Sequence, residues 1–225
     1  VEEMIRAQPM DAVVLVGGCD KTVPAQLMGA ASADVPAIQL LAGPMMPTSY
    51  KGERLGACTD CRRFWAMHRA GKVDAAGIAE VEGNLATTAG TCAVMGTAST
   101  MASMVEALGI GMPGNAAYPA VDARRNVLAR MAGRRIVQLV KDKVSISRIL
   151  TKAAFENAIR ANAAIGGSTN AVIHLIAIAR RLARLADATL ILSDRASDDY
   201  ELVRAMLRAA GVSPYGVIEV DSVDT

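Results

Sequence analysis

The stretch that most constrains the fold of this chain is residues 12–30, AVVLVGGCDKTVPAQLMGA. Residues 13–16 are apolar without alternation, which is typical of a strand covered on both faces of a parallel sheet. Gly17 and Gly18 then permit a sharp turn, and a helical pattern with Thr22 as its cap follows. We therefore predict a strand, a tight loop and a helix. Such a loop lies at the sheet edge where open α/β folds bind ligands.

The loop places a thiol, a carboxylate and an amine at consecutive positions, namely Cys19, Asp20 and Lys21. A phosphate-binding P-loop is rejected, because it needs a glycine directly before its lysine, whereas Asp20 stands there and would repel phosphate. Two interpretations stay open. Either Cys19 is a small buried hydrophobe beside an Asp20–Lys21 ion pair, or the loop is a metal site with Cys19 on a soft metal and Asp20 on a hard one.

The composition limits the function classes. Aromatic residues make up 3% of the 225 residues and hydrophobic residues 52%, so the core must be aliphatic and methionine-rich. A net charge of +2 without interleaved basic and aromatic residues predicts no nucleic-acid partner. We expect no signal peptide and no membrane partner, because no stretch of ~20 residues is continuously apolar. Four cysteines are too few for a disulfide scaffold and favour a reducing cytoplasm.

The pattern continues as an α/β chain. Residues 36–41 predict a second buried strand, because a βαβ unit returns the chain to its sheet after about twenty residues. Residues 43–56 are rich in proline and glycine, and we expect a long functional loop there. A helix capped by Asp60 follows to about Ala70. Further on, we expect a helix over residues 119–133, with Asp122, Arg124, Arg125 and Arg130 on a solvated face.

Cys58 and Cys61 form a C-x-x-C pair near the start of that capped helix. Zinc would need two further ligands at suitable spacing, but Cys19 and Cys92 each stand alone. A redox dithiol would follow a strand and open a helix more directly. We therefore disfavour a metal or redox role for the pair and keep it as a weaker hypothesis.

Cys92, like Cys19, directly follows polar or glycine-containing loop residues in the sequence. Residues 84–91 form that loop, and we expect a helix over residues 93–108. Cys92 would then lie at a helix amino terminus, where the dipole favours a thiolate or an anionic cluster. A buried thiol at a helix start is the alternative.

A third polar loop, residues 166–170 (GGSTN), separates expected helices over residues 147–164 and 171–185. Such a loop can hold a polar or anionic ligand at a helix amino terminus, although a simple turn with Asn170 as cap explains the same residues. We interpret His174, inside the apolar second helix, as a packed core histidine. From residue 188 the pattern predicts one more βαβ unit.

Five motifs together carry a family resemblance: GGCDKT, GACTDCRRFWA, AGTCAVMGTASTM, PAVDARR and ENAIRANAAIGGSTNAVIHL. Over residues 1–185 the chain resembles the amino-terminal domain of the dihydroxy-acid dehydratase and phosphogluconate dehydratase family. TCAVMGTAST and CTDCRR are more similar to the sugar-acid (pentonate) dehydratases than to the branched-chain biosynthetic enzymes. The resemblance implies an α/β fold with a parallel sheet flanked by helices, and it implies that the family's carboxyl-terminal β-barrel domain is absent. Residues 186–225 would be a divergent βαβ tail packed on the same domain.

The resemblance also implies a hydro-lyase that converts a 2,3-dihydroxy sugar acid to a 2-keto-3-deoxy acid. Cys19 and Cys92 match iron–sulfur cluster cysteines, with a 2Fe-2S cluster favoured over a 4Fe-4S cluster. Asp20 matches a Mg²⁺ ligand, and Lys21 matches a catalytic lysine that becomes carbamylated and then binds the same metal. The substrate-side residues would be Ser168, Thr169 and Asn170.

The chain departs from the family pattern in ways that bear on activity. No residue matches the family's first cluster cysteine or a further magnesium-binding acid. The general-base serine and another magnesium-binding glutamate belong to the carboxyl-terminal domain. We therefore expect a fragment that is inactive alone and a full-length form that is a dimer or tetramer. The alternatives are a branched-chain dihydroxy-acid dehydratase and a non-catalytic α/β fragment that binds no cluster.

Overall fold

A two-stranded parallel sheet organises the chain. The structure is a computed structural model, and it describes residues 1–183. β1 (Val13–Gly17) pairs with β2 (Ala37–Leu41) in a register that runs from Val13 opposite Ala37 to Gly17 opposite Leu41. α2 (Thr22–Ala33) connects the two strands. The α/β class and the strand, loop and helix predicted from residues 12–30 are therefore confirmed.

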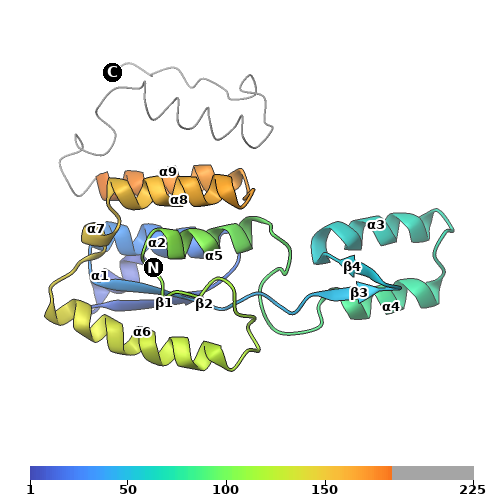
Figure 1. The fold of residues 1–225 in the computed structure, drawn as a ribbon, viewed down its shortest axis with the longest axis horizontal. Helices are drawn as coiled ribbons and strands as arrows, with labels where there is room; N and C mark the ends of the chain where they lie inside the picture. The colour runs from blue at the N-terminus through green and yellow to red at the C-terminus, as the bar shows by residue number, and fades with distance from the viewer. Residues whose placement is uncertain (184–225) are drawn as a thin grey trace, which may run out of the picture.

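Helices cover both faces of this sheet (Figure 1). α6 (Arg124–Lys141) packs on one face against both strands, and α2 packs on the other. α5 (Thr97–Ala107) lies beside α2, and α8 (Lys152–Ala164) and α9 (Asn170–Ala183) form a further layer over α2 and α5. The described part also contains the short helices α1 (Glu2–Ala7) and α7 (Ile146–Ile149).

The main core is aliphatic, as the composition requires, but it is not methionine-rich, because Met101 and Met104 are the two methionines among its buried members in the described part. Many of its fully buried members come from α2, α5 and α9. They include Leu27, Met101, Met104, Val105 and Ile178. Because these side chains lie at the contact of the three helices, the core fixes how the amino termini of α2, α5 and α9 are placed.

A small lobe projects from the sheet between β2 and α5 (Figure 1). It consists of the antiparallel hairpin β3 (Thr48–Tyr50) and β4 (Glu53–Leu55) with α3 (Ala57–Arg69) and α4 (Ala75–Leu85). Its own core contains Tyr50, Leu55, Phe64, Ile78 and Val81.

The expected long loop over residues 43–56 is therefore partly wrong, because the hairpin occupies residues 48–55. Lys51 and Gly52 both have positive φ, 48° and 81°, as the turn of a tight hairpin requires. Lys51 carries no sequence signal for that conformation. Each strand has only three residues, which is too short for a periodic pattern.

Several helix boundaries differ from the predictions, and the starts of α6 and α8 lie five residues later than predicted. α3 begins at Ala57, so that Cys58 and Cys61 lie inside it, and α2 begins at Thr22, which is not its cap. α5 begins at Thr97 rather than residue 93. α6 runs from Arg124 past Gly133, where a Cβ would meet nothing within 4 Å. The predicted unit from residue 188 lies outside the described residues.

We predict that Asp60→Ala lowers the free energy of unfolding of the lobe by about 1 kcal/mol, as for loss of a helix cap. Asp60 Oδ2 accepts the Gly56 N–H at 2.5 Å at the start of α3, and Arg63 donates to Oδ1. The Gly56 N–H, and then Arg63, lower the pKa of Asp60.

The sign of the pH dependence follows from that lowered pKa. The stabilisation is fully present above the ordinary aspartate pKa of about 4 and is lost as the pH falls through the lower folded value. Acid unfolding followed by amide exchange in α3 measures it. Glu82→Gln, at an exposed position of α4, is the control. An unchanged acid transition in Asp60→Ala would contradict this role.

Candidate functional site

The loop between β1 and α2 presents Cys19 to solvent. Cys19 is a free, exposed thiol with φ 75°, a left-handed backbone conformation that is rare for a residue with a side chain. Such strained residues concentrate at functional sites, where the surrounding structure holds them. The exposure rules out the interpretation of Cys19 as a buried hydrophobe.

Asp20 and Lys21 form an ion pair beside this thiol. Lys21 Nζ donates to Asp20 Oδ2 at 2.8 Å, and their side chains are 68% and 42% exposed. The hydrogen bond from Lys21 lowers the pKa of Asp20, and the Cys19 thiol, 3.5 Å from Oδ1, adds to the effect. A solvated pair of this kind contributes ~0–1 kcal/mol to stability. Its energetic role is therefore small, and the oxygens of Asp20 stay accessible.

The segment that carries Cys92 is not helical: Thr91 is bridged to a neighbouring segment, and residues 93–96 form bends and a turn. Thr91 forms a parallel bridge with Pro44, in which Thr91 N–H donates to Gly43 O at 2.9 Å and Met45 N–H donates to Thr91 O at 2.8 Å. Cys92 follows as a half-buried free thiol. The prediction that Cys92 lies at a helix amino terminus is wrong, because bends and a turn follow it and α5 starts only at Thr97.

The two cysteine loops meet through the residues that precede each cysteine. A Cβ on Gly18 would overlap Thr91 Cγ2 and would lie 3.2 Å from Ala42 Cβ. The Thr91 methyl group therefore packs directly on the Gly18 backbone. This contact brings the loop of Cys19 and the segment of Cys92 together at the carboxyl ends of the strands.

The third polar loop is attached to the start of α5. The hydroxyls of Ser168 and Thr97 share a hydrogen bond of 2.7 Å, and Ser168 N–H donates to Thr100 Oγ1 at 3.0 Å. Asn170 Nδ2 also donates to Thr97 Oγ1, at 3.4 Å. Thr169 and Asn170 are exposed. Sequence reasoning missed Thr97, whose one signal was its position directly after Gly96 at a helix start.

His174 on α9 lies within electrostatic reach of the Asp20–Lys21 pair. It is half-buried, and its Nε2 has no hydrogen-bond partner within residues 1–183. Burial lowers the pKa of His174, the Lys21 charge lowers it further, and Asp20 opposes the change. The interpretation of His174 as a packed core residue is therefore incomplete, because the ring is only half-buried and its pKa responds to the charges of Lys21 and Asp20.

The described residues do not complete a metal site by themselves. Within residues 1–183 no three His, Cys, Asp or Glu side chains converge on one metal position. Cys58 and Cys61 lie on α3 in the lobe, apart from both cysteine loops. No helix in this part of the chain is both long and apolar enough to cross a bilayer.

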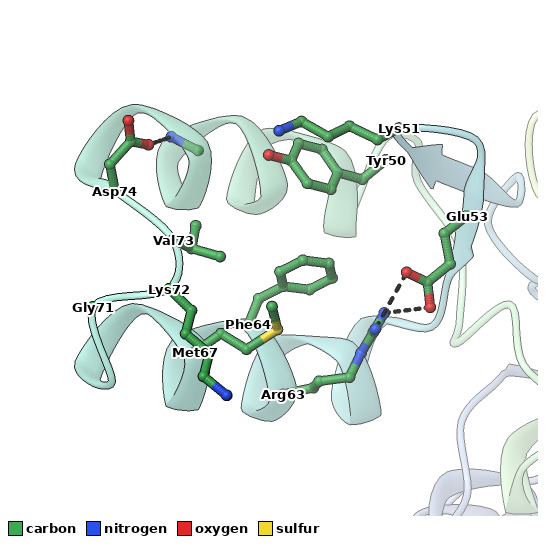
Figure 2. A pocket seen from close by; sticks show the side chains of 11 residues that line it. Tyr50, Lys51, Glu53, Arg63, Phe64, Met67, Gly71, Lys72, Val73 and Asp74 are labelled. Atoms are coloured by element: carbon green, nitrogen blue, oxygen red, sulfur yellow. Dashed lines mark hydrogen bonds and ion pairs between the residues drawn. The ribbon is translucent and has the colours of Figure 1, made fainter.

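A pocket of about 570 Å³ lies in the lobe, between α3, α4 and the hairpin (Figure 2). Several of its polar groups are already paired. Arg63 contacts Glu53 at 2.8 Å, Asp74 accepts the Gly77 N–H at 2.7 Å, and Lys51 lies over the Tyr50 ring. The candidate site is therefore assigned to the cysteine loops and not to this pocket.

Comparisons with known proteins show the family to which the chain belongs. Residues 1–208 match the family model described as dihydroxy-acid/6-phosphogluconate dehydratase N-terminal. The chain is 56% identical to an L-arabinonate dehydratase of Rhizobium leguminosarum bv. trifolii and 58% identical to an L-arabonate dehydratase of Azospirillum brasilense, over 81% of this chain in both cases. A dihydroxy-acid dehydratase of Nocardioides sp. is 37% identical over 100% of the chain.

The chain belongs to the dihydroxy-acid/6-phosphogluconate dehydratase family, of which it carries the amino-terminal part. It spans 31%, 31% and 38% of the length of these three relatives. The match of the family model extends to residue 208, beyond residue 185, where the resemblance described from the sequence ends.

We predict that the Thr97–Ser168 hydrogen bond couples α5 to α9 by about 1 kcal/mol. A double-mutant cycle with Thr97→Val and Ser168→Ala, followed by denaturant unfolding, measures this coupling free energy. Thr97→Ser keeps the hydroxyl and should retain the coupling. Additive single-mutant effects would show that the two hydroxyls act independently.

Proposed function

We propose that the full-length form of this protein is a hydro-lyase that removes water from a 2,3-dihydroxy sugar acid to give a 2-keto-3-deoxy acid. The observation that carries the proposal is the meeting of the Cys19 loop and the Cys92 segment at the Gly18–Thr91 contact. The identity to two proteins named as arabinonate and arabonate dehydratases favours a pentonate as substrate. A dihydroxy acid of branched-chain biosynthesis is the alternative, because dihydroxy-acid dehydratases also match.

The donor chemistry of the loops fits an iron–sulfur cluster beside a magnesium ion. Cys19 and Cys92 supply thiols, which suit iron, and Asp20 supplies a carboxylate, which suits Mg²⁺. Neither cysteine forms a disulfide, and the lowered pKa of Asp20 keeps its carboxylate ionised. When bound, these metals would polarise the substrate's hydroxyl and carboxylate groups as Lewis acids. We favour a 2Fe-2S cluster, and the remaining ligands must come from outside the described residues.

Lys21 reverses its electrostatic role if it is carbamylated. As an ammonium it neutralises Asp20. Reaction of the neutral amine with CO₂ forms a carbamate and releases a proton, which replaces a cation with a second anionic oxygen donor beside Asp20. The Lys21 side chain is 68% exposed, so CO₂ can reach it. Two adjacent oxygen donors are what a hard cation prefers.

The GGSTN loop lies on the substrate side of this arrangement. Ser168 is held by Thr97 and Thr100, whereas Thr169 and Asn170 are exposed beside it. In our proposal this loop orients the hydroxyl groups of the sugar acid. We expect the 225-residue chain alone to be inactive, because the donors that it offers in the described part do not complete a metal site.

In the full-length form purified without oxygen, we predict that Cys19→Ser or Cys92→Ser abolishes visible iron–sulfur absorption. Each change removes a thiolate ligand, and serine is a poor ligand for iron. Cys58→Ser and Cys61→Ser are the matched controls and should leave the absorption unchanged, because both residues lie in the lobe. Full absorption in Cys19→Ser or Cys92→Ser would remove that cysteine from the site.

Lys21→Arg separates the two roles of Lys21. Arginine keeps the positive charge but cannot form the carbamate, so we predict loss of Mg²⁺ binding and of keto-acid formation while iron–sulfur absorption is retained. Titration with Mg²⁺ and an assay on pentonates measure both. Near-normal magnesium-dependent turnover in Lys21→Arg would mean that Lys21 is only a charge partner of Asp20.

A further inference from the structure

Arg125 is a buried cation near the start of α6. Its exposed fraction is 9%, and within residues 1–183 it has no ion-pair partner. The guanidinium instead donates to oxygens of two chain segments, the end of β2 and residues 115–119. Nη1 reaches Leu41 O and Asn115 Oδ1, both at 3.1 Å, while Nη2 donates to Tyr118 O and Nε lies 3.4 Å from Pro119 O.

Burying a cation without a carboxylate is costly unless its N–H groups are satisfied. Here the planar fork of donors holds the end of β2 to residues 115–119, which a lysine ammonium could not do in the same geometry. Asn115 reinforces this junction, because its Oδ1 accepts the Leu41 N–H and its Nδ2 donates to Gln39 O. Arg125 therefore fixes where the chain leaves β2.

Gly43 lies directly against the guanidinium. It has φ 91°, and a Cβ there would be 2.6 Å from Arg125 Nε and 2.8 Å from Ala120 N. The next residue, Pro44, accepts the Ala120 N–H at 2.8 Å. Residues 43–45 are thus held on one side by Arg125 and its loop.

On its other side the same segment holds Thr91. Gly43 O accepts the Thr91 N–H, and Thr91 O accepts the Met45 N–H. Thr91 in turn packs on Gly18 and precedes Cys92. A continuous set of contacts therefore runs from Arg125 through Gly43 to Thr91, and so to both cysteines.

We infer that Arg125 is a positioning residue for the metal site: it fixes residues 43–45, which hold Thr91 on Gly18 and so set Cys92 relative to Cys19. It touches neither cysteine and acts through the backbone bridge. The inference rests on the proposed function for its consequence, since the cysteines need fixed relative positions if they share a cluster. The mechanical link, by which Arg125 holds residues 43–45 and so Thr91, concerns this chain alone.

The first test uses the 225-residue chain and needs no metal. In Arg125→Lys we expect the amides of Thr91 and Met45 to exchange at least about tenfold faster, because local opening of the bridge becomes easier. The sheet amide of Val13, bonded to Pro36 O, should be unchanged. Alkylation of Cys92 should accelerate while that of Cys58 in the lobe stays constant.

Arg124→Lys is the matched control. Arg124 is the neighbouring arginine, but its side chain is 59% exposed and pairs with Asp122 on the surface. We expect no change in the Thr91 and Met45 amides. Gly43→Ala is a second variant. Its added Cβ would lie 2.6 Å from Arg125 Nε, so it should disturb the same contact and speed the exchange of the same amides.

The second test uses the full-length form with its metals. In the presence of a chelator, the iron–sulfur absorption of Arg125→Lys should fall at least about fivefold faster than that of the wild-type protein. The reason is that loss of a cluster ligand follows local opening. The absorption of Arg124→Lys should fall at the wild-type rate. If the wild-type protein holds no cluster, the proposed function fails. The amide-exchange result still decides whether the mechanical link from Arg125 to Thr91 exists.

Three results would overturn the inference. Thr91 and Met45 amides that stay protected in Arg125→Lys and Gly43→Ala would break the mechanical link. Faster exchange of those amides with unchanged cluster retention would show that the link does not serve the cysteines. General loss of protection that includes Val13, in both variants, would make Arg125 a determinant of the whole fold and not a positioning residue.

Discussion

The close approach of Thr91 to the Gly18 backbone is the contact on which the rest of the site depends. It exists because Gly18 has no Cβ, and a side chain there would separate the two loops. On one side of the contact, β1 ends and Cys19 adopts its left-handed conformation. On the other, the bridge to Pro44 keeps the segment before Cys92 extended. Two free thiols distant in sequence are thus brought to one edge of the sheet.

The amino termini of three helices give this edge its electrostatic character. α2 begins directly after Lys21, α5 begins at Thr97, and α9 begins at Asn170. The core packing of these helices and the Thr97–Ser168 hydrogen bond hold the three ends in place. Free backbone N–H groups and helix dipoles at such ends favour anions. A carboxylate substrate and an anionic cluster both match that preference.

The sequence predicted the parts of the fold that local patterns determine. An unbroken apolar run, two glycines and a helical period were enough for β1, the Cys19 loop and α2, and the same reasoning located β2. The start of α5 was misplaced because Thr91 pairs with Pro44, which belongs to another segment, and residues 93–96 form bends and a turn before the helix begins. The hairpin of β3 and β4 was missed because Lys51 adopts positive φ without a sequence signal.

The candidate residues were likewise found from motifs, but the contacts that bring their loops together were not predicted. GGCDKT, TCAVMGTAST and GGSTN identified the three loops, whereas the Gly18–Thr91 and Thr97–Ser168 contacts join residues far apart in the chain. Arg125 looked like part of a solvated helix face, yet it is buried, since burial depends on Gly43 and Asn115 from other segments.

In the proposed function the two cysteine loops come together to hold one iron–sulfur cluster. The iron and acid-labile sulfide content of the full-length form, purified without oxygen, is the measurement that bears on it most closely. We expect stoichiometric iron and sulfide in equal amounts, with a Mössbauer spectrum of a two-iron cluster. Folded protein that contains neither iron nor labile sulfide would rule out the shared cluster.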